Sequence, residues 1–283
     1  MLKAHPLAAT LTERLAEPPG DALSLFWLGQ AGFVIDGQKR RVVIDPYLSN
    51  SLGEKYQDTR FPHLRMMPIP IAPRDIPHVD IVLATHAHTD HLDPDTLQDL
   101  LRANPRAVLV APKSARDLAL TRSQIAQSRL HLIEAHETLN LAGVQITALR
   151  AAHEGLELDA EGLHKFLGLA VTIAGRVVFH SGDTIPFDGQ STEVASLHAD
   201  LGLFPVNGRD AVRKSNGVPG NMTIAEAVTL AQNAHISTVI AHHFGLFAFN
   251  SVEREEIEKV ATAARDVYLY PAKTGAEYRF LSE

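Results

Sequence analysis

The feature that most constrains the fold is the stretch LATHAHTDHLDPD, in which three histidines and an aspartate directly follow an apolar run. That run, residues 81–84, has the composition of a buried strand. His86 and His88 are two positions apart, so both can point to one side of a chain leaving the strand, while Asp90 and His91 fall where the backbone turns. Four such side chains at the end of one strand predict a binding site for a multiply charged cation. Solvated loop residues beside a helix cap are the alternative, which suits a lone histidine better.

Short apolar or alternating runs predict strands in both halves of the chain. The expected strands are residues 25–28, 32–35, 41–44, 80–84 and 107–111 in the first half, and 144–149, 168–173, 176–180, 201–206, 237–241 and 266–270 in the second.

Helical patterns lie between some of these strands. The Asp-Pro pair at 93–94 is typical of an N-cap followed by proline at the first helical position. Thr223 and Glu226 have the spacing of a capping box, and Asn250 with Glu253 opens another helical pattern in a similar way. One helix is therefore expected to begin immediately after the histidine cluster.

The distribution of these elements predicts a single α/β domain over residues 1–283. Strands dominate each half and helices close it, without a linker between the halves, which favours two sheets packed face to face and covered by helices. Residues 1–23 are expected to be an N-terminal extension. The segment 51–78 contains a stretch too rich in proline for a central strand or helix, and we expect it to be a loop over the site.

Composition limits the chemistry and the partners. The chain has no cysteine, so a metal must be held by His, Asp or Glu. A formal charge of -7 argues against nucleic acid as a partner, because binding to the phosphate backbone rests on clustered Lys and Arg. The sequence shows neither a signal peptide nor a stretch of ~20 apolar residues. We therefore expect a cytoplasmic protein that does not interact with a membrane.

The pattern His-x-His-x-Asp-His after an apolar strand resembles the signature of the metallo-β-lactamase superfamily. Further elements follow in order: Asp45 in VVIDPYLS, His153 in AAHE, Asp183 in HSGDT and a late histidine in VIAHHFGLF. The resemblance covers about residues 24–280. It implies a four-layer αββα sandwich, in which helices flank two mixed β-sheets.

Three stretches resemble one branch of that superfamily, the branch that contains L-ascorbate-6-phosphate lactonase. They are WLGQAGFVI, FPVNGRDAVRKSNGVPGNMTIAEAV and HFGLF. Gln30, within the first stretch, stands where related sequences often carry histidine. Many members of the branch are uncharacterised hydrolases.

The resemblance implies a site for two divalent transition-metal ions. Imidazole and carboxylate ligands suit zinc or manganese, and iron is also compatible. Asp90 or Asp183 would accept the proton of the attacking water. Asp45 would orient the ligand loop rather than bind metal, with an ordinary turn residue as the alternative. The implied ligands are His86, His88 and His153 for one ion, Asp90, His91 and His243 for the other, and Asp183 between them.

Individual histidines carry further expectations. His88 favours hydrolysis, since diiron relatives that reduce oxygen resemble a pattern with Glu at that position. His242 and His243 should point to opposite sides of a strand, so only one of them can face the metals easily. The related branch has its ligand directly before an aromatic residue and a turn, which favours His243. His180 and His242 are expected to be packed or to orient other groups.

Substrate recognition is expected from the segment NGRDAVRKSNGVPGNMT. It contains Arg209, Arg213 and Lys214 and leads to a helix N-terminus near Asn221, so guanidinium groups and backbone N–H donors could meet an anionic group. The resemblance favours Asn207 and Arg209 as the substrate-binding residues. A solvated basic loop is the alternative.

The expected activity is hydrolysis, in which a metal-bridging hydroxide attacks a carbonyl carbon and opens a lactone of an anionic, sugar-like and in some cases phosphorylated substrate. A phosphodiesterase on the same two ions is one alternative. A binding or regulatory protein that keeps the fold without turnover is another, and the complete ligand set argues against it. The expected partner is a small anionic substrate, and assembly into a homo-oligomer is compatible with the sequence.

Overall fold

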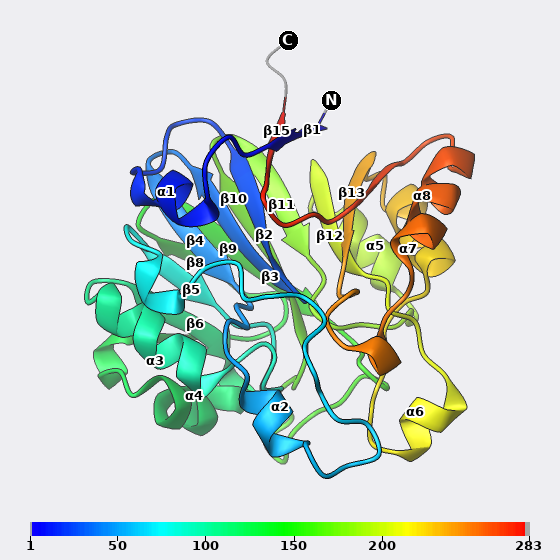
Figure 1. The fold of residues 1–283 in the computed structure, drawn as a ribbon, viewed down its shortest axis with the longest axis horizontal. Helices are drawn as coiled ribbons and strands as arrows, with labels where there is room; N and C mark the ends of the chain where they lie inside the picture. Colours follow the sequence, from blue (N-terminus) through cyan, green and yellow to red (C-terminus); the bar gives the residue numbers. More distant parts are fainter. Residues whose placement is uncertain (1, 281–283) are drawn as a thin grey trace.

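The computed structural model describes residues 2–280, which form two β-sheets packed face to face with helices on both outer faces (Figure 1). Within these residues the first sheet has eight strands, in the spatial order β1 (Leu2–Pro6), β15 (Ala276–Phe280), β2 (Ser24–Gly29), β3 (Gly32–Gly37), β4 (Arg40–Ile44), β5 (Ile81–Leu83), β6 (Val108–Pro112) and β7 (Leu130–Ile133). The second has seven, in the order β14 (Tyr268–Pro271), β13 (Thr238–His242), β12 (Leu201–Pro205), β11 (Arg176–His180), β10 (Leu167–Ile173), β9 (Val144–Arg150) and β8 (Thr138–Leu141). Both sheets combine parallel and antiparallel pairs, so the expected αββα fold is confirmed.

The helices complete the four layers. The outer face of the first sheet is covered by α1 (Leu11–Ala16), α3 (Pro94–Ala103) and α4 (Arg116–Ser123). The second sheet is covered by α5 (Gln190–Ala195), α7 (Ile224–Asn233) and α8 (Arg254–Ala263). Two short helices, α2 (Ser51–Lys55) and α6 (Ala211–Ser215), both lie at the end of the molecule opposite β1 and β15, apart from each other (Figure 1). Short 3-10 helices occur at Pro73–Asp75, Lys113–Ala115, Gln127–Arg129 and Ala248–Asn250.

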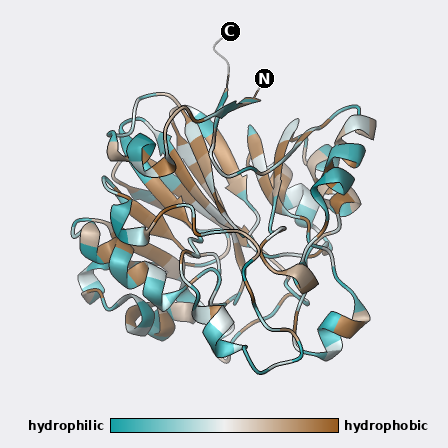
Figure 2. Cartoon of the chain, in the orientation of Figure 1, coloured by the Kyte–Doolittle hydropathy of each residue, from teal (hydrophilic) through white to brown (hydrophobic). Residues whose placement is uncertain are grey.

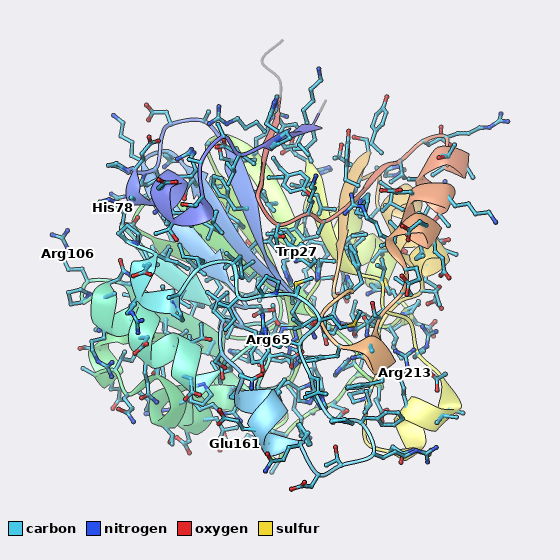
Figure 3. The ribbon with its side chains drawn as sticks, in the orientation of Figure 1. Trp27, Arg65, His78, Arg106, Glu161 and Arg213 are labelled. Atoms are coloured by element: carbon cyan, nitrogen blue, oxygen red, sulfur yellow. The ribbon has the colours of Figure 1, made fainter. Side chains whose placement is uncertain are left out.

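The central strands of the first sheet are buried on both faces. Along β3, Phe33 and Ile35 belong to the core between the sheets, whereas Val34 belongs to the core beneath the helices. This alternation follows from the pleat, which points successive side chains to opposite faces. Trp27, labelled near the centre of Figure 3, stacks on Phe244 with ring centroids 5.4 Å apart and joins β2 to the loop after β13. Figure 2 shows the strands mostly in the hydrophobic colour, while the helices carry most of the hydrophilic residues.

Each strand expected from an apolar run is present, with bounds that differ by one or two residues. The helix after the cluster begins at Pro94 behind the N-cap Asp93, and Thr223 with Glu226 forms the expected capping box. The expectation for Asn250 was wrong. The helix α8 begins at Arg254 without a side-chain cap, because Asn250 ends a 3-10 turn and its side chain accepts hydrogen bonds from distant residues instead.

The first residues of the chain are part of the sheet and its covering layer. β1 pairs with β15 in antiparallel fashion, and Leu11 and Leu15 of α1 belong to the core beneath the outer helices. Among the described helices, none has both the length and the apolar composition needed to cross a membrane.

Candidate metal centre

The loop between β5 and α3 carries four of the predicted ligands. The strand is fully buried, and the backbone N–H of Ala84 still donates to Val110 of the neighbouring strand β6. At the other end, Asp93 caps α3 by accepting from the backbone N–H of Thr96, with a distance of 3.0 Å. Within the loop, the N–H of Leu92 donates to the carbonyl of His88. The ligand loop is therefore fixed at both ends by regular structure.

The other three predicted ligands come from strand ends of the second sheet. His153 follows β9, Asp183 follows β11 and His243 follows β13. Gly182 directly before Asp183 has a φ of 62°, and a Cβ at this position would lie 2.5 Å from the carbonyl oxygen of Leu167. Only glycine fits there, because the backbone conformation and the close approach both exclude a side chain.

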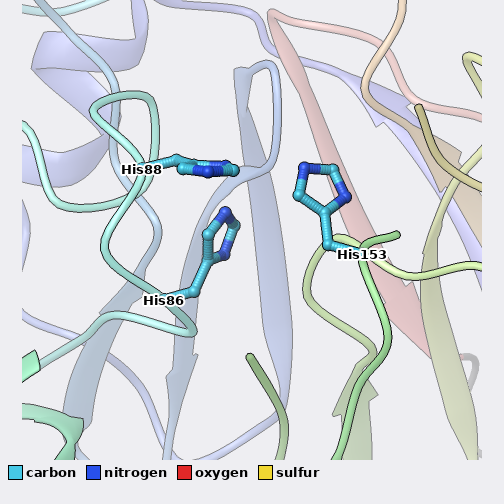
Figure 4. A group of neighbouring side chains, drawn as sticks. All are labelled: His86, His88 and His153. Atoms are coloured by element: carbon cyan, nitrogen blue, oxygen red, sulfur yellow. The ribbon is translucent and has the colours of Figure 1, made fainter. Parts of the chain in front are cut away.

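The structure brings all seven predicted ligands together. In Figure 4 the rings of His86, His88 and His153 point toward one another. Because His86 and His91 each belong to two groups of potential ligands, the groups form one continuous cluster rather than separate sites. The three groups, in each of which the ligand atoms lie within 4.8 Å of one another, are His86, His88 and His153; His86, His91 and Asp183; and Asp90, His91 and His243.

The chemistry of these side chains fits a metal. Nε2 of His86, Nε2 of His91 and Oδ1 of Asp183 are buried without a hydrogen-bond partner, although the last two lie 3.3 Å apart. Buried polar atoms are nearly always satisfied in folded proteins. Cations would satisfy all three atoms, and imidazole with carboxylate is a ligand set for zinc, manganese or iron.

Asp45 fixes the orientation of the ligand loop. Its Oδ2 accepts hydrogen bonds from Nδ1 of His91, at 2.7 Å, and from the hydroxyl of Thr85, at 2.6 Å. Its Oδ1 accepts from the backbone N–H of Thr85 at 2.8 Å. With Nδ1 of His91 engaged in this way, Nε2 is the nitrogen that faces the cluster. Asp45 belongs to none of the three ligand groups, so its contacts are those of an orienting residue.

The charges of the cluster shift the pKa of its members strongly. Burial alone would lower the pKa of His91 and His243, but Asp183 and Asp90 raise it, in His243 to about 9. Burial alone would raise the pKa of the two carboxyl groups, but the same histidines hold it below the usual range of an aspartate. Without metal, the neighbouring carboxylates thus favour the protonated, positively charged form of both imidazoles. Cations must displace these protons when they bind.

Gln30, at the turn between β2 and β3, is a part of the site to which sequence reasoning gave no role. Its side-chain amide donates to Oδ2 of Asp90 at 2.9 Å and lies 3.1 Å from Nε2 of His243. Its carbonyl oxygen accepts from the indole N–H of Trp27 and from the backbone N–H of His243. Its φ of 49° is unusual for a residue other than glycine. Gln30 thus ties the first sheet to ligands from both sides of the cluster.

His180 and His242 lie in the core and in none of the ligand groups. The ring of His242 lies 4.8 Å from that of His180 and meets the ring of Phe33 edge-on at 5.5 Å, and neither of its nitrogens has a hydrogen-bond partner. Burial lowers the pKa of His242 well below its usual value, so the ring is neutral. Nε2 of His180 donates to the carbonyl of Ala31, and its Nδ1 accepts from the N–H of Gly182.

The cluster opens into a cavity of about 440 Å³, which we call the first cavity. One wall comes from the end of α2 and the segment that follows it, within the loop expected over the site. Lys55 and Arg60 supply positive charge there, and neither forms an ion pair within residues 2–280. Tyr56, Phe61 and His63 give the same wall an aromatic surface. Five of the predicted ligands also line this cavity: His88, Asp90, His153, Asp183 and His243.

Asn207 and Arg209 are not among the residues that line the first cavity. The guanidinium of Arg209 makes two hydrogen bonds to the carboxylate of Glu226, at 2.6 and 2.7 Å, and a third to the carbonyl of Asn221. Asn207 is buried, and its amide donates to Asn250 and accepts from the side chain of Asn221. The role of both residues in substrate binding stays a prediction. The contacts found here stabilise the loop around α6, where Figure 3 labels Arg213.

Comparison with known proteins gives a consistent picture. Residues 40–244 match the family model described as "Beta-lactamase superfamily domain". A protein of Methanosarcina mazei described as "UPF0173 metal-dependent hydrolase" is 25% identical over 249 residues, which make up 86% of this chain and 93% of that protein.

Two solved structures share the fold. The isothiocyanate hydrolase from Delia radicum gut bacteria is 17% identical with a TM-score of 0.71, and the match covers 92% of this chain and 100% of that one. Igni18, described as a metallo hydrolase from Ignicoccus hospitalis, is 19% identical with a TM-score of 0.65, over 92% of this chain and 100% of the other. At this level of identity the likeness concerns the fold alone.

Proposed function

This chain belongs to the beta-lactamase superfamily, and we propose that it is a metal-dependent hydrolase that holds two divalent transition-metal ions and opens a lactone of a small anionic substrate. The observation that carries the proposal is the continuous cluster of three overlapping ligand groups. Asp183 supports a site for two ions rather than one. Its Oδ2 lies 3.7 Å from Nε2 of His153 and 3.2 Å from Nε2 of His243, so one carboxylate reaches ligands assigned to different ions.

Zinc or manganese, or iron, bound there would supply an acidified water as the nucleophile and would polarise the scissile carbonyl. The side chain of Asp90 is 17% exposed and that of Asp183 is 4% exposed, so Asp90 is the carboxylate with better access to the first cavity. We therefore assign to Asp90 the role of accepting the proton of the attacking water. The hydrogen bond from Gln30 to its Oδ2 holds the carboxylate in a fixed orientation for that transfer.

The first cavity supports an anionic substrate. Among the described residues, Lys55 and Arg60 have no carboxylate partner, whereas the guanidinium of Arg209 is already held by Glu226. Two uncompensated cations on one wall attract a negative group and fix its position relative to the metal cluster. The resemblance to the branch of L-ascorbate-6-phosphate lactonase supports a lactone as the group that is opened.

We expect the double variant Lys55→Ala, Arg60→Ala to raise the KM for an anionic lactone about fivefold or more, while the KM for a neutral lactone of the same size changes little. The physical reason is that only the charged substrate loses an attraction. Steady-state kinetics on the matched pair of lactones measures the difference. Arg209→Ala is the control, because it removes a cation that is paired within the protein.

Two outcomes would count against this assignment. If the double variant impaired both substrates equally, Lys55 and Arg60 would be needed for the shape of the wall rather than for its charge. If Arg209→Ala alone produced the selective increase in KM, the earlier expectation for Arg209 would hold, and the guanidinium would have to leave Glu226 when substrate binds.

A phosphodiesterase is the second candidate, because the same cationic wall and ligand set would suit a phosphodiester. Turnover of bis-nitrophenyl phosphate or a cyclic nucleotide, without turnover of any lactone, would favour it. A protein that binds metal and the anionic ligand but turns over neither class would instead be a binding or regulatory protein.

A further inference from the structure

A second cavity, of about 510 Å³, lies against the first and shares part of its wall. His88 and His153 line both cavities, and so do Gly217 and Pro219 from the loop after α6. The predicted ligands His88 and His153 therefore lie between the first and the second cavity. Each space is large enough to hold a separate part of one substrate molecule.

The second cavity has an apolar wall. Ala115, Leu118 and Phe166 line it, and none of them lines the first cavity. The ring of Phe166 packs against His153 with ring centroids 5.3 Å apart, so the apolar wall continues up to the metal cluster. Leu118 is 44% exposed. This surface lacks a partner within the described chain.

Two further exposed leucines are sequence neighbours of a residue that lines the second cavity. Leu156 and Leu158 are 41% and 50% exposed, and they flank Glu157, which lines the second cavity. Together with Leu118 they account for three of the eight large apolar side chains that are exposed among residues 2–280. A single exposed leucine is ordinary on a protein surface, but Leu118 lines the second cavity together with Ala115 and Phe166, and such an exposed apolar surface within a cavity suits an apolar ligand.

Three of the five charged residues that line the second cavity are engaged by other groups of the protein. Glu157 forms an ion pair with Lys165 at 3.3 Å, and Oδ1 of Asp159 accepts hydrogen bonds from two backbone N–H groups. The remaining charged side chains are Glu154 and Lys214, which have opposite signs. The second cavity is thus lined by three carboxylates and two ammonium groups, an excess of one negative charge that disfavours an anionic group, in contrast to the cationic wall of the first cavity.

We propose that the second cavity receives an uncharged, apolar portion of the substrate, while the first cavity holds the anionic portion. This inference rests on the proposed function, because it places the scissile bond at His88 and His153, between the two cavities. It narrows the substrate class to amphipathic lactones or esters that carry an alkyl or aryl group on one side. A lactone that is polyhydroxylated on both sides would leave the apolar wall unused.

A series of anionic lactones with neutral alkyl groups of increasing length tests the inference with the metal-loaded protein. Burial of each added methylene should raise kcat/KM about three- to fourfold until the cavity is filled. In Leu118→Asp this dependence on chain length should be largely lost. Leu64→Asp is the matched control, because Leu64 is 66% exposed and lines neither cavity, and it should keep the dependence.

Binding of the neutral fluorescent probe N-phenylnaphthylamine gives a readout that does not need turnover. Saturable binding that is weakened by Leu118→Asp and not by Leu64→Asp supports the apolar site.

Hydrolysis of the shortest lactone without any gain from longer chains would overturn the inference and leave the proposed function intact. Failure to hydrolyse any member, with probe binding still sensitive to Leu118→Asp, would overturn the proposed function and support the apolar site. Equal probe binding by both variants and the unaltered protein would overturn the inference.

Discussion

Replacing Asp183 with Asn is expected to remove most of the bound metal and to lower kcat/KM more than about 100-fold, beyond the roughly 10- to 100-fold effect of groups that only orient a ligand. The two oxygens of Asp183 lie 3.3 Å from Nε2 of His91 and 3.2 Å from Nε2 of His243, within the same buried cluster. Asparagine keeps the shape of the side chain. It loses the negative charge that offsets two cations at a site shielded from water.

The control for this variant is Asp188→Asn, five residues later in the chain. Asp188 is exposed and lies outside the three ligand groups. Its replacement should leave metal content and kcat/KM unchanged. If Asp183→Asn bound as much metal as the unaltered protein and lost only a few-fold in activity, Asp183 would not lie between the two ions.

The variants His243→Phe and His242→Phe should differ in metal content and in kcat/KM, although the two residues are neighbours in the chain. His243→Phe removes a member of a ligand group, so we expect the loss of one ion and a fall in kcat/KM of more than about 100-fold, as for loss of other metal ligands. His242→Phe should keep both ions, because the ring of His242 packs against Phe33 and His180 in the core. Metal analysis and kinetics on both purified variants provide the comparison.

Thermal unfolding adds a second measurement for the same pair. A buried polar group without a partner costs about 1–3 kcal/mol, and His242 has two such nitrogens. A phenylalanine of similar shape removes this cost, so the unfolding midpoint of His242→Phe should be equal to or higher than that of the unaltered protein. Loss of metal from His242→Phe with retention in His243→Phe would mean that the ligand is His242.

Strands that are buried on both faces could be predicted from the sequence, because their residues form continuous apolar runs. Runs such as residues 32–35 and 41–44 form strands that are buried on both faces, so their apolar composition was sufficient to find them. The missed strands β1, β7 and β8 contain many exposed or half-exposed residues and lie at sheet edges. The missed strand β15 lies inside the sheet and is buried over Ala276, Glu277 and Tyr278, but its charged residues interrupt the apolar pattern. Mixed composition at an edge does not distinguish a strand from a loop.

The ligand cluster could be predicted for a different reason. His86, His88, Asp90 and His91 lie within six residues, and the resemblance supplied the distant members that proximity along the chain could not. The contacts of Gln30 with Asp90 and His243 depend on how the two sheets meet, and nothing in the local sequence reports that.

Substrate-binding residues were harder to predict, because an unpaired arginine and a paired one look alike in a sequence. The resemblance favoured Arg209, and its role in substrate binding stays a prediction. In the structure its guanidinium is held by Glu226, which also forms the capping box of α7. Nothing in the sequence singled out Lys55, the last residue of the short helix α2, or Arg60, in the irregular segment after it. Only the folded chain brings them to the wall of the first cavity.

The number of metal ions bound by each chain tests the central claim most directly. Elemental analysis of protein purified after expression in metal-replete medium, combined with an accurate protein concentration, gives this number. The cluster of seven ligands predicts close to two transition-metal ions per chain. The His243→Phe variant should lose one of these ions, and the Asp183→Asn variant should lose most of the bound metal. A folded protein that persistently holds one ion, or none, would contradict the binuclear site and the hydrolysis proposed from it.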